Sequence, residues 1–209
     1  MQDENAYLDS KIKEFIEFIR TETTQEVYNE YIISGEIWVF KKLFGNEWFQ
    51  KFDSFKKYVS KKLNVHYNDI SIAGSGKLGF SINPEKHYKK FDKQSDIDII
   101  IVSRDLFYAF WKEYTLCSYK RVRFQNFKQI CFGIMRKYLC LEIIDSPNNL
   151  FIQWEKNTKG FEKDIQMLFG IENEIHYRIF ESWSAAQDYY ISSIEKCKDK
   201  LNEVENEIN

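Results

Sequence analysis

The chain has 209 residues, and its 44% hydrophobic content is enough to bury a sizeable core. Its 30 basic and 32 acidic residues give a net charge of -2, which excludes a general electrostatic attraction to nucleic acid or membranes. The polar, acidic beginning is not of signal-peptide type, and no apolar run is long enough to span a bilayer. We therefore expect a cytoplasmic protein with reduced cysteines, since the four cysteines form no C-x-x-C pair.

The first 65 residues are expected to be helical. Apolar residues recur at helical spacing over 7–20 and 48–63, and an apolar-rich segment, 27–44, lies between them. The pattern changes at "YNDISIAG", where a turn signal precedes two isoleucines that alternate as in a strand, Ile70 and Ile72.

The clearest strand is "SDIDIIIVS", residues 95–103, whose β-branched residues suit a central strand covered on both faces. A helix over 104–116 follows, and within the ambiguous segment 117–165 the stretch "YLCLEIIDSP" fits a strand stopped by Pro147. From about Trp183 the chain is helical again, with apolar residues three and four apart. This spacing favours a terminal helix packed on its own domain; a contact with a second copy or a partner protein is the alternative.

A glycine cluster, "AGSGKLGFSINP" at 73–84, holds three of the 8 glycines. It is not a P-loop, because Ser71 stands where the first glycine belongs and Leu78 follows Lys77. The letters G-x-G-x-x-G are present from Gly74, but the βαβ context of a dinucleotide fold is missing. The cluster is either a plain turn or a turn whose N–H groups hold phosphate.

Two acids decide between these interpretations. Asp96 and Asp98 lie one residue apart on the predicted strand, so both carboxylates point to one side of the sheet. Like charges this close require a positive group between them, and Mg²⁺ prefers carboxylate and phosphate oxygens. The turn and the acid pair together predict a metal-dependent nucleoside triphosphate site, although each motif alone is often only a turn or a solvated acid pair.

These two motifs, Gly74-Ser75 after "ISIA" and the stretch 95–102, resemble the DNA polymerase β-like nucleotidyltransferase superfamily. The resemblance implies that Gly74 and Ser75 contact the phosphates of the nucleotide, with Lys77 assisting, and that the two aspartates bind divalent metals. It also implies a third acid on a neighbouring strand, for which Glu142 is the best candidate. The pattern is also similar to oligonucleotide cyclases, except that Phe80 replaces a threonine, and to small bacterial proteins of defence or toxin–antitoxin type.

Two further groups of cations are candidates for binding. Residues 114–141 contain six basic residues and no acid, interleaved with aromatic residues, which fits either a nucleic-acid-binding surface or a solvated basic face. Four lysines lie between the two motifs, near the predicted phosphates: Lys86, Lys89, Lys90 and Lys93. Arg178, within "YRIFESW", is interpreted as a packing or capping residue.

We therefore expect an α/β (α+β) fold of one domain, with a small mixed sheet of nucleotidyltransferase type at 66–150 and helical parts at 1–65 and 151–209. The expected activity is Mg²⁺- or Mn²⁺-dependent transfer of a nucleoside monophosphate from an NTP such as ATP to a hydroxyl of RNA, tRNA or protein. Asp96 and Asp98 would be catalytic and metal-binding, and Gly74, Ser75 and Lys77 nucleotide-binding. The alternatives are a non-catalytic binding or antitoxin module and an oligonucleotide cyclase-like enzyme.

Overall fold

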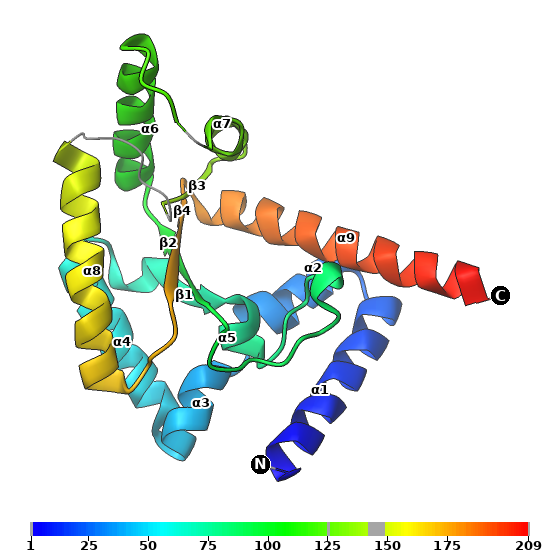
Figure 1. The fold of residues 1–209 in the computed structure, drawn as a ribbon. Helices are drawn as coiled ribbons and strands as arrows, with labels where there is room; N and C mark the ends of the chain where they lie inside the picture. The colour runs from blue at the N-terminus through cyan, green and yellow to red at the C-terminus, as the bar shows by residue number, and fades with distance from the viewer. Residues whose placement is uncertain (1, 125, 142–148, 209) are drawn as a thin grey trace.

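The structure is a computed structural model that describes residues 2–124, 126–141 and 149–208. It is an α+β fold with one four-stranded mixed sheet surrounded by helices (Figure 1). The strands are β1 (Ile70–Ala73), β2 (Ile97–Val102), β3 (Tyr138–Cys140) and β4 (Ile175–Phe180). The α-helices are α1 (Gln2–Thr21), α2 (Thr24–Val27), α3 (Trp38–Phe44), α4 (Trp48–Leu63), α5 (Gly74–Leu78), α6 (Arg104–Tyr119), α7 (Phe127–Met135), α8 (Asn149–Phe169) and α9 (Trp183–Ile208). One π-helix, η1 (Tyr28–Ile33), and three short 3₁₀-helices, η2 (Gly45–Glu47), η3 (Tyr67–Asp69) and η4 (Pro84–Lys86), connect them.

The sheet has the strand order β1-β2-β4-β3, so two strands distant in sequence lie at its centre. β2 pairs with β1 in antiparallel orientation, with Ala73 opposite Asp98. On its other side β2 pairs with β4 in parallel orientation, with Asp98 opposite His176. The end of β1, the beginning of β2 and the beginning of β4 therefore meet at one edge of the sheet.

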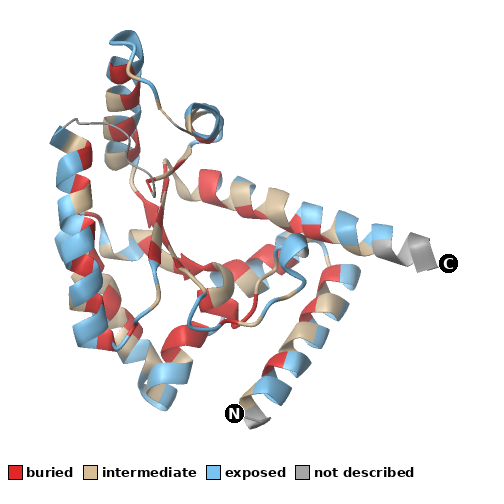
Figure 2. Cartoon of the chain, viewed as in Figure 1, coloured by how far each residue is buried: buried red, intermediate tan, exposed pale blue. Residues whose placement is uncertain are grey.

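Both faces of the sheet are covered by helices, because the central strands carry apolar residues on both sides. One face packs against α4, α6 and α8, through rings that include Phe55, Phe110 and Phe161. The opposite face packs against α1, η1 and α9, where Phe15 and Ile194 are fully buried. Figure 2 shows buried residues along the strands and along the inward stripes of the surrounding helices.

Local sequence explains where the main helices begin and end. In α4 the buried residues Phe52, Phe55, Val59 and Leu63 form one apolar stripe. The helix ends at Asn64 in the left-handed conformation, a common helix terminator. α6 begins after Ser103, whose side-chain oxygen accepts a hydrogen bond from the backbone N–H of Leu106.

The expected α+β class with a small mixed sheet is confirmed, and so are the helices at 48–63 and from Trp183 and the strand within 95–103. One strand was not predicted: β4 lies inside the segment 151–209 that was expected to be helical, so the sheet draws on this part of the chain. Tyr190, Ile194 and Cys197 are buried, so α9 packs on its own domain as the favoured interpretation stated.

All four cysteines lie in the described part of the chain, and each is a free thiol. Among the described residues, no helix combines the length and the apolar character that a membrane span needs.

Candidate functional site

The two sequence motifs meet in one cavity. A cavity of about 690 Å³ opens at the edge of the sheet where β1 ends and β2 begins. Gly74 and Ser75 line it from the turn after β1, and Asp96 and Asp98 line it from the beginning of β2. Four cations also line it, from three different parts of the chain: Lys86, Lys89, Arg178 and Lys196. Glu85 lines it as well, so the cavity combines three carboxylates with four cations, and a phosphate–metal site requires both kinds of charge.

Gly74 allows the turn to lie directly against the acid pair. Its φ is +64°, a left-handed conformation that residues with a side chain rarely adopt. A Cβ atom at this position would lie 2.7 Å from Oδ2 of Asp98. Only glycine fits here without a shift of the aspartate, so position 74 fixes the distance between the turn and the carboxylate.

Arg178 from β4 forms an ion pair with Asp98. Oδ1 of Asp98 accepts hydrogen bonds from Nε and Nη2 of Arg178, each at 3.3 Å. Nη1 of the same guanidinium donates to the hydroxyl of Tyr189 at 2.8 Å. Burial alone would lower the pKa of Arg178, but the Asp98 carboxylate raises it above its ordinary value. Arg178 is therefore not only a packing residue, because it supplies a positive charge to one member of the acid pair.

Asp96 belongs to a second cluster at the same edge of the sheet. The carboxylate Oδ2 of Asp96 lies 3.7 Å from Nδ1 of His176, and Nε2 of that ring lies 3.6 Å from Oε1 of Glu174. One ligand atom from each of the three residues lies within 4.8 Å of the other two. Two carboxylates and an imidazole form a donor set that a divalent cation can use, and Mn²⁺ accepts both donor types.

Glu174 is an acid next to the beginning of β2 that the sequence did not suggest. The resemblance requires an acid on a strand next to Asp96 and Asp98, and Glu174 directly precedes β4, the parallel neighbour of β2. Its backbone carbonyl accepts a hydrogen bond from the N–H of Ile97 at 2.8 Å, which aligns it with the beginning of β2. Glu142, the candidate from the sequence, lies outside the described residues.

Sequence reasoning missed Glu174 and His176 because the strand that positions them was missed. A signal for it was present: in "IHYRIF" the apolar residues Ile175, Tyr177 and Ile179 alternate with the polar His176 and Arg178. This alternation is typical of a strand that is apolar on one face and polar on the other. It places both polar residues on the face that carries Asp96 and Asp98.

Lys77 is not brought to the cavity. Its side chain is only 3% exposed, and Nζ donates to the backbone carbonyl of Ile33 at 3.2 Å. Burial lowers the pKa of Lys77 to about 8. Gly74 and Ser75 face the cavity, whereas Lys77, on the buried side of the same short helix, contacts η1 instead.

Of the lysines between the two motifs, some line the cavity and others do not. Lys86 and Lys89 line the cavity, although Lys89 also forms an ion pair with Asp92 at 3.1 Å. Lys90 instead pairs with Asp9 of α1 at 2.6 Å. A cation that the sequence did not suggest, Lys196 of α9, joins the cavity lining.

A buried hydroxyl without a partner also lines the cavity. Tyr190 is 7% exposed, and its Oη has no hydrogen-bond partner among the described residues. Burial raises the pKa of this phenol well above its ordinary value, so the group stays a neutral donor. An unpaired buried hydroxyl costs about 1–3 kcal/mol, which a bound molecule with a suitable polar atom would relieve.

No protein-family model matches the chain, and comparison with curated proteins and with solved structures gives no match either.

Proposed function

We propose that the protein is a metal-dependent nucleotidyltransferase, which moves a nucleoside monophosphate from an NTP to an acceptor hydroxyl. One observation carries the proposal: Gly74, Ser75, Asp96 and Asp98, which are distant in sequence, line a single cavity that also holds four cations. Acids that bind metal and cations that bind phosphate are both needed to hold a metal–triphosphate complex.

The residues present fit a divalent metal ion. Asp96, Glu174 and His176 offer ligand atoms within 4.8 Å of one another. Of these three only Asp96 lines the cavity, together with Asp98, whose Oδ2 lies beside Gly74. This oxygen-rich set with one imidazole suits Mn²⁺ and accepts Mg²⁺. A bound ion would acidify the acceptor hydroxyl and neutralise charge on the leaving pyrophosphate.

The remaining cavity residues suit the nucleotide. In the proposed arrangement the triphosphate lies against Gly74 and Ser75 and is neutralised by Lys86 and Lys196. The rings of Tyr189 and Tyr190 give the cavity an aromatic wall on α9, against which a base or ribose packs. The unpaired hydroxyl of Tyr190 would then donate to a polar atom of the nucleotide.

The proposed reaction is a displacement at the α-phosphorus. The acceptor oxygen forms a bond to this phosphorus, and the bond from the phosphorus to the oxygen bridging to the β-phosphate breaks, so pyrophosphate leaves. The hydroxyl proton passes to the Asp96 carboxylate, which at 38% exposed can release it to solvent. Arg178 fixes the orientation of Asp98 through two hydrogen bonds to its Oδ1.

The Arg178–Asp98 pair also favours a second function, a non-catalytic nucleotide-binding module. The two hydrogen bonds from the guanidinium to Asp98 both go to Oδ1, so a protein cation already occupies one of the four carboxylate oxygens of the Asp96–Asp98 pair. In this second case the cavity binds a nucleotide without transferring it, and binding itself is the function.

The decisive experiment is a transfer assay with each ribonucleoside triphosphate labelled at the α-phosphate, with Mg²⁺ or Mn²⁺, and with total RNA and total protein as acceptors. We expect a labelled RNA or protein product that is lost in Asp96→Asn. The matched control is Asp105→Asn, which removes an exposed acid in the first turn of α6 and should keep full activity. Nucleotide binding without any labelled product would establish the second function and contradict the first.

A further inference from the structure

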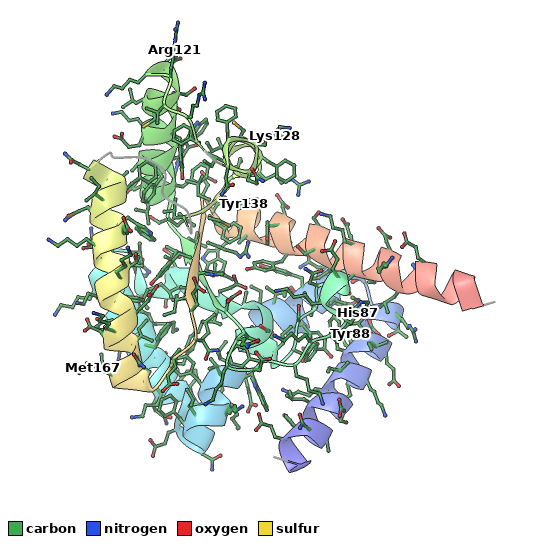
Figure 3. The ribbon with its side chains drawn as sticks, viewed as in Figure 1. His87, Tyr88, Arg121, Lys128, Tyr138 and Met167 are labelled. Atoms are coloured by element: carbon green, nitrogen blue, oxygen red, sulfur yellow. The ribbon has the colours of Figure 1, made fainter. Side chains whose placement is uncertain are left out.

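The arm formed by the end of α6 and by α7 carries an excess of positive charge. Between residues 114 and 141 the chain has six basic residues and no acidic residue, although the whole protein has a net charge of -2. All six basic side chains are exposed. Figure 3 shows Arg121 at the end of α6 remote from the sheet and Lys128 on α7. This local excess matches a polyanion rather than a neutral partner.

Exposed aromatic rings lie among these cations. Tyr119 is 83% exposed, and Phe127 and Phe132 of α7 are each about half exposed. The guanidinium of Arg136 lies over the ring of Phe132, 4.2 Å from its centre. Surfaces that bind single-stranded nucleic acid combine cations, which pair with its phosphates, and exposed aromatic rings, on which its bases stack.

The arm lies next to a second hollow that shares one lining residue with the cavity. A second hollow of about 310 Å³ lies between the end of α7 and the beginning of α9. Arg136 and Lys137 line it together with one acid, Asp188, so cations outnumber acids there. Tyr189 lines both this hollow and the main cavity, and its hydroxyl accepts a hydrogen bond from Arg178 beside Asp98. In Figure 1 α7 lies next to the beginning of α9. Tyr189 therefore stands between the two hollows, on the way from α7 to the acid pair.

We infer that this surface, formed by Lys128, Phe132, Arg136 and Lys137, binds single-stranded nucleic acid and directs its hydroxyl-bearing end past Tyr189 into the cavity. The role of this strand as the acceptor rests on the proposed function, whereas the binding itself does not. The phosphates pair with the cations, and a base stacks on Phe132.

The test is fluorescence anisotropy with a labelled single-stranded RNA of about 12 nucleotides, titrated between about 50 and 200 mM salt. We expect Lys128→Gln/Arg136→Gln/Lys137→Gln to weaken binding and to reduce the slope of log K against log salt by about 2, since each phosphate contact on a single strand contributes about 0.7. The control with the same change of charge is Lys61→Gln/Lys156→Gln/Lys163→Gln, whose exposed lysines lie on α4 and α8, and it should bind as the wild type does.

A second variant separates stacking from charge. Phe132→Ala should weaken RNA binding at least about fivefold while the salt slope stays unchanged, because stacking releases no counterions. Single-stranded DNA of the same sequence is a parallel probe: equal affinity assigns recognition to phosphates and bases, and tighter RNA binding adds the 2′-hydroxyl. Both results support the inference.

The folded variant Asp96→Asn/Asp98→Asn should bind RNA as the wild type does, so a failure of the proposed transfer activity leaves this result intact. The inference is overturned if the wild type does not bind RNA, or if the α7 triple variant keeps the affinity and the salt slope of the wild type.

Discussion

The two faces of the central strands differ sharply at one end of the sheet. On the face toward α4, α6 and α8, every residue of β2 and β4 is apolar and buried, including Ile97, Ile99 and Tyr177. On the face toward α9 and α1, the same strands begin with Asp96, Asp98, His176 and Arg178 and become apolar only further along. Alternate residues of one strand thus serve a core and a polar cavity.

This difference agrees with the proposed ligand site on one face. Burying polar groups inside a sheet is unfavourable unless they are paired, so a strand without a binding role would be apolar on both faces. Here the polar residues are confined to the edge where the cavity opens, and they pair with one another across β2 and β4. The apolar face stabilises the fold, and the polar edge carries the proposed function.

The largest expected effect is a difference in the free energy of unfolding between two variants of β2, one on its apolar face and one at its polar end. Ile99→Ala should lower the free energy of unfolding by about 3 kcal/mol, because Ile99 is fully buried and the change leaves a cavity. Asp96→Asn should change it by less than about 0.5 kcal/mol, because Asp96 is partly exposed. Urea denaturation of both variants measures the difference. Equal destabilisation by the two variants would show that the faces do not have separate roles.

The next effect concerns Lys77, which lies on the buried side of α5. The pKa of Lys77 in the folded protein is about 8, below its ordinary value of 10.5, so the unfolded chain binds more protons between these pH values. The energetic cost of burying the ammonium is therefore complete below pH 8 and disappears as the pH rises to about 10.5.

Lys77→Met should remove this cost. The shift corresponds to about 3 kcal/mol, and loss of the hydrogen bond to Ile33 reduces the net gain in stability at pH 7 to about 2 kcal/mol. The gain should shrink between pH 8 and pH 10, and NTP affinity should not change. Urea denaturation at several pH values checks the first expectation. A loss of NTP binding in Lys77→Met would instead show that Lys77 contributes to the nucleotide site.

The smallest effect is expected at Gly74. Gly74→Ala places a Cβ against Oδ2 of Asp98 and should weaken NTP binding at least about tenfold, or about 1.4 kcal/mol, with an unchanged far-UV circular dichroism spectrum. Gly160→Ala is the matched control, because a Cβ there meets no atom within 4 Å. Full NTP affinity in Gly74→Ala would show that the turn does not set the geometry of the site.

The sequence predicted the elements whose local signals are strong. The strand at 97–102 and the helix at 48–63 follow from periodicity, because these features depend on neighbouring residues. The convergence of Gly74 and Asp98 was predicted from the two motifs taken together. Glu174, His176 and Arg178 were not predicted as site residues. Their positions depend on the parallel pairing of β2 with β4, a contact across about 80 residues that local patterns do not encode.

Lys77 is the opposite case: the sequence predicted it as a site residue, but it does not line the cavity. In sequence it lies beside Gly74 and Ser75 and matches the chemistry of a phosphate ligand. A helix turns by about 100° per residue, so neighbours in sequence point in different directions, and tertiary packing decided which of them face the cavity. The structure directs Lys77 toward η1 and brings Lys196 from the distant α9 to the cavity instead.

The most direct test of the central claim is calorimetric titration of the protein with Mn²⁺–ATP, and with the other Mn²⁺–NTP complexes in turn. We predict that the wild type binds at least one of them and that Asp96→Asn/Asp98→Asn, shown to be folded by circular dichroism, loses at least about a hundredfold in affinity, or about 2.7 kcal/mol. Unchanged affinity in this folded double variant would contradict the assignment of Asp96 and Asp98 to a metal–nucleotide site.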